Sequence, residues 1–568
     1  MNTYEESDEE VLSDTDIQRS IEESCLSRSE SFPPLVGKSS LLWFVLWFYV
    51  VVLHCGSTVD PLVPPGCGLE TALTLAVAAG LVENVRVLLD RGASPLNTNS
   101  RNESPLLLAV RGGSYQVSQV LLSRGSWVGQ PGPRGWTALH EAARQGSAEL
   151  LLLLLRSGAP VALTTTGGRT ALAVAAEHGQ AHIAEILLNC GSRVNSQALS
   201  GESVLMAAAG AGDPALVQLL LDNGANPDLP SGTGHLPVHK AAYAGHYRVL
   251  EMLLPLTTPR SIKAAGQSPL HSAAAGGHAR CLRLLLASGA DVNYRMSARH
   301  SGNHRDLRRS ALYYAVSNGD AGCTRALLEA GARPDLDPLQ CLLVAVRSGR
   351  HDLARLLLLA RADANCYFRA VSDTVFPTAL QYALKDAAMM RLLLNHGYDA
   401  RSCFLCHHGD NDDQGGHTPG HAQRLRCGCG GYEGGAGART CSRWDHEDPW
   451  PAEDHGDRAI PFCEFMGLCC LVHLSGLVVR TLLDYVGQVS LCPPLRSLLQ
   501  GQGAWADICS ILRSPRSLGH ICRLEIRRCL TLKRLNNPDV MNSDLFPPRL
   551  RDYLLYRELD PQGQFSFY

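Results

Sequence analysis

The heptapeptide Trp136-Thr-Ala-Leu-His-Glu-Ala142 returns along the chain in related forms, and this repetition decides the fold. Copies of the same pattern close on Ala76, Ala109, Ala142, Ala175, Ala208, Ala241 and Ala273. The first six of these alanines lie 33 residues apart, and weaker copies close at Ala315, Ala345 and Ala383. A fixed step of this length is typical of a solenoid, in which each repeat packs only on its neighbours.

Most copies also carry the signals that begin and end a pair of helices. The Thr or Ser at its second position is a good N-cap, because its oxygen accepts a backbone N–H of the first turn. Proline follows at Pro105 and Pro269, where a helix start needs no N–H donor. A second apolar run ends in a glycine suited to the left-handed C-cap. These glycines are Gly92, Gly125, Gly158, Gly191, Gly224, Gly289, Gly331 and Gly397. Arg361 stands at that place in one repeat, so we expect a strained or altered turn there.

This pattern resembles the ankyrin repeat, whose signature is Thr-Pro-Leu-His-x-Ala. The resemblance implies an all-α solenoid of about ten helix-turn-helix repeats with β-hairpin loops, covering residues 69–404. His140, His239 and His271 occupy the histidine position of the signature. The resemblance implies that they hydrogen-bond across adjacent hairpins and do not bind metal.

Composition narrows the function classes. The 568 residues include 51 Lys and Arg against 54 Asp and Glu, a net charge of -3, which argues against binding dominated by nucleic-acid or membrane charge. The 20 cysteines are sparse for a disulfide framework, and the acidic N-terminal residues do not resemble a signal peptide,. We therefore expect reduced thiols in a cytoplasmic protein, with the nucleus left open. No P-loop, nucleophile elbow or HExxH motif occurs, so we predict no catalytic residues and no cofactor.

The segments outside the repeats differ in composition. We divide them into an acidic tail at 1–38, an apolar segment and linker at 39–68, a Gly/His-rich insertion at 405–459, a helical connector at 460–514 and a C-terminal box at 515–568. Residues 41–53 are wholly apolar, but as a helix they would rise only about 20 Å against a hydrocarbon core of ~30 Å. Membrane contact is therefore disfavoured but open. Segments 39–66 and 409–459 could also be products of splicing or gene-model error.

The acidic tail contains Asp14-Thr-Asp-Ile-Gln-Arg-Ser-Ile-Glu-Glu-Ser24, which resembles a ubiquitin-interacting motif. As a helix it would place Ile17, Ser20, Ile21 and Ser24 on one face. The resemblance implies that these four residues bind ubiquitin. The alternative is a plain acidic tail, because Ser20 replaces the usual alanine and the trailing acid is missing.

The C-terminal box begins with an apolar stripe on a short helix. Leu518, Cys522 and Ile526 are spaced four residues apart, and Ser517 precedes them as an N-cap candidate,. An exposed stripe of this kind fits a groove on a partner. The three residues resemble the Ser/Thr-Leu-x-x-x-Cys-x-x-x-Ile motif with which a SOCS box, a small three-helix module, binds Elongin C.

The second half of a SOCS box carries a Leu-Pro-Leu-Pro-x-x-Leu motif for a cullin. Residues 544–547 occupy its first four positions here, and Asp544 and Leu545 depart from the pattern. Phe546, Pro547, Leu550 and Tyr553 keep it. The resemblance therefore supports Elongin binding more strongly than cullin binding.

Repeats followed by this box are similar to the ankyrin repeat and SOCS box proteins, in particular the subgroup with members 14 and 15. The resemblance implies a non-catalytic adaptor that binds a target protein and recruits Elongin B/C, a cullin-5-type cullin and a RING subunit for ubiquitination. Trp127, Trp136, Tyr243 and Tyr247 are candidate aromatic anchors for an unidentified target,. A plain ankyrin scaffold and a membrane-tethered receptor remain alternatives.

Two clusters admit other interpretations. Cys403-x-x-Cys406-His407-His408, followed by Cys427-x-Cys429, suggests zinc,, but the second pair has a single spacer and we predict no metal ligands. The box helix carries a basic cluster without interleaved aromatic residues, which we interpret as solvated or partner-facing and not as a nucleic-acid site. Its members are Arg513, Arg516, Arg523, Arg527, Arg528, Lys533 and Arg534.

Overall fold

A computed structural model of the full chain describes residues 72–296, 310–337, 339–367, 374–406, 408, 459–469, 471–535, 537–542 and 546–559. The chain divides into two compact units. Unit 1 is residues 1–200 with 222–224, and unit 2 is residues 201–221 with 225–568. The predicted ubiquitin-binding residues Ile17, Ser20, Ile21 and Ser24 and the apolar segment 41–53 lie outside the described residues.

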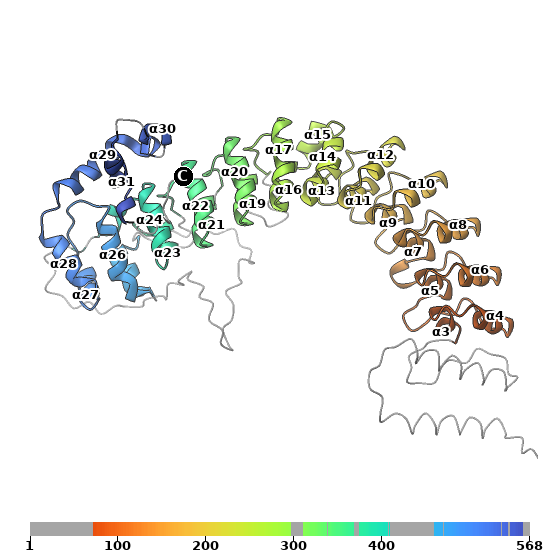
Figure 1. The fold of residues 1–568 in the computed structure, drawn as a ribbon. Helices are drawn as coiled ribbons and strands as arrows, with labels where there is room; N and C mark the ends of the chain where they lie inside the picture. The colour runs from red at the N-terminus through yellow and green to blue at the C-terminus, as the bar shows by residue number, and fades with distance from the viewer. Residues whose placement is uncertain are drawn as a thin grey trace, which may run out of the picture. The chain divides into compact units, whose positions relative to one another are not determined.

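The described part of unit 1 forms four antiparallel helix pairs that stand side by side in chain order (Figure 1). The pairs are α3 (Ala72–Ala78) with α4 (Val82–Asp90), α5 (Pro105–Arg111) with α6 (Tyr115–Ser123), α7 (Ala138–Gln145) with α8 (Ala148–Arg156), and α9 (Ala171–Glu177) with α10 (Ala181–Asn189). The first helices pack on one another from α3 through α5 and α7 to α9. This nearest-neighbour packing is the solenoid that the 33-residue step predicts.

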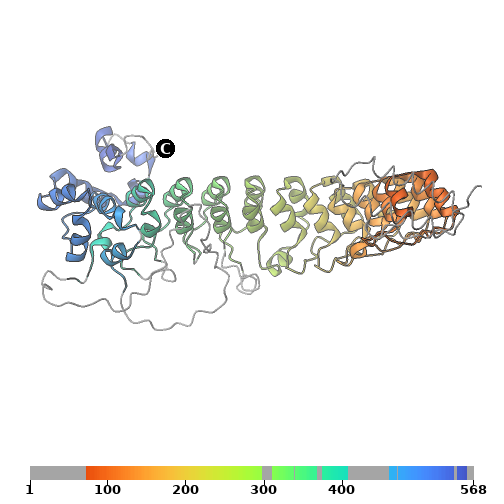
Figure 2. The same cartoon turned by 90° about the horizontal axis from the view of Figure 1, so that it is seen from below.

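The described part of unit 2 contains six pairs of the same kind (Figures 1 and 2). They are α11 (Val204–Ala211) with α12 (Pro214–Asp222), α13 (Pro237–Ala244) with α14 (Tyr247–Leu253), α16 (Pro269–Gly276) with α17 (Ala279–Ala287), α19 (Ala311–Ser317) with α20 (Ala321–Glu329), α21 (Cys341–Arg347) with α22 (His351–Leu359), and α23 (Ala379–Ala383) with α24 (Ala387–Asn395). The prediction of about ten repeats is confirmed. A further short helix, α15 (Pro259–Ala264), lies between α14 and α16. The repeat pattern did not predict it.

The start and stop signals act as the sequence predicts. The Ser104 side chain accepts the Leu107 backbone N–H (3.2 Å), with Pro105 as the first helical residue of α5. The glycines after the second helices have positive φ, such as 89° at Gly331. Arg361, at the same place in its own repeat, has φ of 68°. The repeat keeps the left-handed turn at the cost of backbone strain, because a Cβ is disfavoured there.

The core of the repeats is made of leucine and alanine. Within α9, for example, Leu172 and Ala175 are fully buried. The loops between pairs are tight hairpins, as in the backbone bond from Thr165 N–H to Arg169 O (2.9 Å). Among the described residues they form only isolated bridges, such as Thr164 with Thr170, and no extended strands.

Two of the signature histidines make the predicted bonds across adjacent hairpins. His140 Nδ1 accepts the Thr137 N–H, so its Nε2–H is free to donate to Arg169 O (3.1 Å) in the next loop. His239 Nε2 likewise lies 2.8 Å from Gln267 O. His271 is fully buried, and its ring packs edge-on against Tyr314. Burial lowers the pKa of His140, which favours the neutral ring that this bonding needs.

Beyond the repeats, unit 2 ends in helices of unequal length that do not follow the paired pattern (Figure 2). The connector contains α25 (Phe462–Leu468), α26 (Ser475–Leu483), α27 (Pro493–Gln500) and α28 (Trp505–Arg513). The box contains α29 (Leu518–Leu535), α30 (Pro538–Met541) and α31 (Pro548–Leu554). The prediction of a small three-helix box is confirmed. Helix α26 packs on α24, the last helix of the repeats.

The described part of the chain holds no helix long and apolar enough to span a bilayer. All described cysteines are free thiols. Several of them, such as Cys281 and Cys323, are buried in second helices, where a thiol packs as a small apolar group.

Candidate functional site

The N-terminal half of α29 presents an exposed apolar face. Ser517 caps this helix, because its Oγ accepts the His520 backbone N–H (3.2 Å). Leu518 is 76% exposed, Ile521 is 51% exposed and the Cys522 thiol is also exposed. Helical spacing puts these three side chains on one face. We call Leu518, Ile521 and Cys522 the docking face. The sequence motif pointed to Leu518 and Cys522 and missed Ile521.

Ile526, the third residue of the predicted Elongin-binding motif, lies elsewhere. It is partly buried and packs against the core of the box, together with Leu530 and Phe546. That core consists of Leu535, Met541, Leu554 and Leu555. Ile526 therefore helps to hold α29 on the box, and the docking face is formed by the turns before it.

Arg523 fixes the opposite side of α29. This residue is only 4% exposed. Its guanidinium lies 3.4 Å from the ring centre of Tyr553 and 4.4 Å from that of Tyr556, and it forms an ion pair with Glu558. Cation–π contacts of this kind are strongest where water is excluded. The interpretation of the whole basic cluster as a solvated surface is wrong for Arg523, because aromatic residues late in the box enclose it.

Arg527 connects the box to the end of the repeats. It donates one hydrogen bond to Leu554 O (2.6 Å) and another to Asn395 O (2.6 Å) at the end of α24. Burial lowers the pKa of its guanidinium. It, too, departs from the interpretation of a solvated cluster, whereas Arg528 is exposed and pairs with Glu525.

Two further donors fix α29 against the connector. Arg516 donates to Leu483 O (2.8 Å), and His520 Nε2 lies 2.8 Å from Val486 O. Near them the rings of Tyr485 and Tyr556 stack with centres 4.3 Å apart. The helix is thus held along one side by polar contacts, which leaves the docking face open to solvent.

The residues predicted to bind a cullin fall into two groups. Phe546 packs on the box core and Tyr553 stacks on Arg523, so both have a structural role. Pro547 is exposed and Leu550 is 37% exposed, so these two are available to a partner. Asp544 and Leu545, which depart from the family pattern, lie outside the described residues.

A second candidate surface lies on the repeats of unit 2. First helices α11, α13, α16 and α19 line a hollow of about 520 Å³. Its lining combines apolar and polar side chains, among them Met206, Lys240, Tyr243, Gln267 and Asn318. Such a mixture suits a protein or peptide ligand.

The four candidate aromatic anchors differ in exposure. Tyr243 lines the hollow and is 57% exposed, and Trp127 in unit 1 is also 57% exposed. The Trp136 Nε1–H donates to Glu141 (2.9 Å), and Arg280 lies 4.3 Å above the Tyr247 ring. Trp136 and Tyr247 thus make contacts within the chain, whereas Trp127 and Tyr243 are exposed to solvent and accessible to a partner.

The chain matches known families at both of these surfaces. Residues 125–198 and 205–296 match ankyrin repeats (3 copies), and residues 270–328 match ankyrin repeats (many copies). Residues 514–555, which contain the docking face, match the SOCS box. The chain belongs to the ankyrin repeat and SOCS box family. The expected family is confirmed.

Individual relatives agree with this assignment. Human ankyrin repeat and SOCS box protein 14 is 42% identical over 282 residues, which are 50% of this chain and 43% of that protein. Rat ankyrin repeat and SOCS box protein 2 is 33% identical over 305 residues, 54% of this chain and 44% of that protein. This chain therefore covers less than half the length of these ankyrin repeat and SOCS box relatives.

A bovine protein named dynein axonemal heavy chain 12 is also similar. It is 43% identical over 319 residues, which are 56% of this chain and 81% of that protein. The name describes the bovine protein and assigns no activity to this family member, whose two modules are protein-interaction modules.

Proposed function

We propose that this chain is a non-catalytic, substrate-recognition adaptor of an Elongin B/C–cullin–RING ubiquitin ligase. The observation that carries the proposal is the docking face. Leu518, Ile521 and Cys522 are exposed on a helix whose other side is fixed by Arg523 and Arg527. A rigid, preorganised apolar face loses little conformational entropy when a partner groove covers it.

In this proposal the Elongin C groove receives the docking face, and Pro547 and Leu550 contribute to a neighbouring cullin contact. The repeats bind the target protein, with Tyr243 and the hollow around it as the contact in unit 2. Ubiquitin transfer is then accelerated because target lysines and the charged E2 are held together at high effective concentration. The chemistry belongs to the recruited subunits.

Co-expression of the full chain with Elongin B and C tests the first step. We expect wild type to co-purify with both subunits. Leu518→Ala combined with Cys522→Ala removes two side chains of the docking face and should weaken binding about 30-fold or more, the scale of a hot spot. The matched control is Leu477→Ala on α26, since Leu477 is 54% exposed but lies outside the docking face.

Three outcomes distinguish the alternatives. Failure of wild type to co-purify would contradict the adaptor proposal and favour a plain ankyrin scaffold. Wild-type binding by the double variant would place the contact elsewhere on the box. Leu550→Asp should reduce capture of a cullin-5-type cullin by the ternary complex without affecting Elongin binding, which separates the two contacts.

A further inference from the structure

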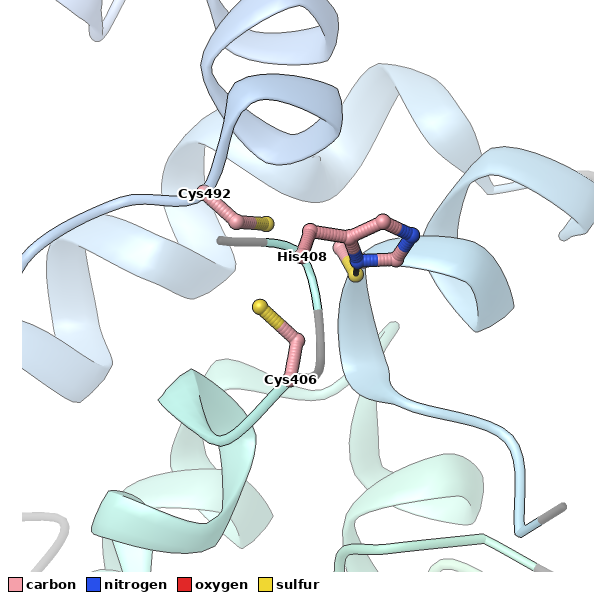
Figure 3. A group of neighbouring side chains, drawn as sticks. Cys406, His408 and Cys492 are labelled. Carbon is pink, nitrogen blue, oxygen red and sulfur yellow. Dashed lines mark hydrogen bonds between the residues drawn. The ribbon is translucent and has the colours of Figure 1, made fainter. Parts of the chain in front are cut away.

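Four side chains with metal-binding atoms meet beside the last repeat of unit 2. They are Cys406, His408, Cys463 and Cys492, and their ligand atoms all lie within 4.8 Å of one another. Figure 3 shows the thiols of Cys406 and Cys492 pointing into the same space as the His408 ring. The first and last of them, Cys406 and Cys492, lie 86 positions apart in the sequence, so only the folded chain assembles the four.

The four residues come from three segments that pack together. Cys406 and His408 follow the 3-10 helix η2 (Ala400–Phe404), which contacts α25. Cys463 is the second residue of α25. Cys492 directly precedes α27, which also packs on α25. Because each segment leaves or enters a helix at the cluster, the helix contacts themselves set the positions of the ligands.

The spacing fits a tetrahedral ion. Zinc is bound at about 2.3 Å from sulfur and about 2.0–2.1 Å from nitrogen, which puts neighbouring ligand atoms roughly 3.4–3.8 Å apart. His408 Nδ1 already lies 3.9 Å from Cys463 Sγ. The other pairs lie within 4.8 Å, so small side-chain movements would close the tetrahedron.

The His408 ring is oriented as in a metal ligand. Its Nδ1 faces the sulfur of Cys463, while its Nε2 lies 3.5 Å from the Glu464 carboxylate. Metal-binding histidines commonly give their second ring N–H to a carboxylate or carbonyl, which fixes the tautomer and ring direction. Glu464 is the residue next to Cys463, so the same turn of α25 supplies one ligand and the support for another.

Not every cysteine near the cluster belongs to it. Cys403, which the sequence paired with Cys406, is buried with its sulfur 3.9 Å from the Tyr398 hydroxyl and takes no part in the cluster. Cys427 and Cys429, the other pair weighed in the sequence, lie outside the described residues. Cys463 and Cys492 are the ligands that no spacing in the sequence indicated.

We propose that Cys406, His408, Cys463 and Cys492 bind one structural zinc ion. Three sulfurs and one imidazole favour zinc over hard cations, which prefer oxygen ligands. Protein groups fill all four positions, so the ion has no open site for catalysis. It would join the end of the repeats, through η2, to α25 and α27 of the connector.

Metal analysis of the full chain, purified under reducing conditions without a His-tag, tests the proposal. We expect one zinc per chain by inductively coupled plasma mass spectrometry. Cys463→Ser and Cys492→Ser should each abolish stoichiometric zinc. Cys469→Ser is the matched control, because Cys469 is a buried cysteine directly after α25 that lies outside the cluster, and this variant should retain the ion.

Cobalt substitution reads out the ligands directly. Co²⁺ added to the chelator-treated chain should give the intense visible bands of a tetrahedral site and a thiolate-to-cobalt charge-transfer band. Both should be absent from Cys463→Ser. Absence of zinc in wild type, together with no cobalt spectrum, would overturn the proposal, as would full zinc in both cluster variants.

Thiol labelling locates the ion within the chain. In the zinc-loaded protein, N-ethylmaleimide should modify Cys509, a half-exposed thiol, but spare Cys406 and Cys492, which are similarly half-exposed. A zinc chelator should make both reactive. Protection that withstands the chelator and disappears only on reduction would identify a disulfide and would overturn the zinc site.

Discussion

The ankyrin repeats and the C-terminal box are both helical, but different contacts hold them. In the repeats, the same leucine and alanine positions are buried pair after pair, as at Leu172 and Ala175. Among its described residues the box has a small apolar core, Leu535, Met541, Leu554 and Leu555. The buried Arg523 and the partly buried Arg527 complete it by contacting rings and carbonyls from distant segments. Local periodic contacts can be read from sequence, whereas contacts between distant segments cannot.

The largest expected effect concerns the place where repeats and box meet. His396, at the end of α24, is buried, and its burial, together with the nearby Arg527 and Arg355, lowers its pKa from 6.5 to about 4. As pH falls, the unfolded chain therefore takes up this proton before the folded chain does. The neutral, buried His396 therefore contributes to the free energy of unfolding above pH 6.5. This contribution should be lost, by about 3 kcal/mol, as pH falls towards 4.

Urea unfolding followed by circular dichroism at pH 7 and pH 4 measures this loss. The variant His396→Leu cannot take up the proton, so its stability should fall about 3 kcal/mol less between the two pH values than that of wild type. An equal loss in both proteins would show that His396 does not carry the effect.

The next largest effect compares a contact between distant segments, made by Arg527, with a local surface ion pair, made by Arg528. Arg527→Ala should destabilise the box by about 2 kcal/mol, because the carbonyls of Leu554 and Asn395 lose a charged donor,. Arg528→Ala is the matched control, since its ion pair with Glu525 is solvent-exposed and water screens such a pair, so its loss should leave the stability of the box almost unchanged. Hydrogen exchange of peptides from α29 and α31 measures the effect of each variant on the box. In both variants, peptides from the repeats of unit 1 should keep their protection from exchange. Equal exchange in the two variants would contradict the structural role of Arg527.

The smallest effect lies in the repeats. Arg361 has a left-handed backbone (φ of 68°) at the place where Gly331 has φ of 89°. Arg361→Gly should therefore stabilise its repeat by about 1 kcal/mol, and Gly331→Ala should destabilise its own by a similar amount. A Cβ at Gly331 meets no atom within 4 Å, so the second change measures backbone strain alone. A loss of stability in Arg361→Gly would show that contacts of the Arg361 side chain stabilise the repeat by more than the backbone strain destabilises it.

Much of the fold could be predicted because its signals are local. The caps, the first-turn prolines and the glycine turns each depend on a few neighbouring residues. The bonds of His140 and His239 also follow from the repeat, since the acceptor carbonyl recurs one repeat later. Arg361 shows the limit of such rules: the turn kept its left-handed geometry without glycine, because the packing of the flanking helices outweighs a modest strain.

The candidate site was predicted only in part. Helical spacing found Leu518 and Cys522, but it could not tell that Ile526 packs inward or that Ile521 is exposed. The sequence did contain a signal for the buried side of α29. Arg523 and Arg527 share one helix face, and Tyr553 and Tyr556, whose rings could contact them, follow late in the box. Without the fold, nothing linked that face to those rings.

The sequence by itself determined the repeated architecture, the family and the helix that carries the docking face, because these depend on spacing within one helix or one repeat. Only the tertiary structure decided which arginines are buried, where the box attaches to α24, and that Cys406 and His408 meet Cys463 and Cys492. Those contacts join residues that lie up to 132 positions apart in the sequence. Their geometry is set by the packing of whole helices, and no local pattern encodes it.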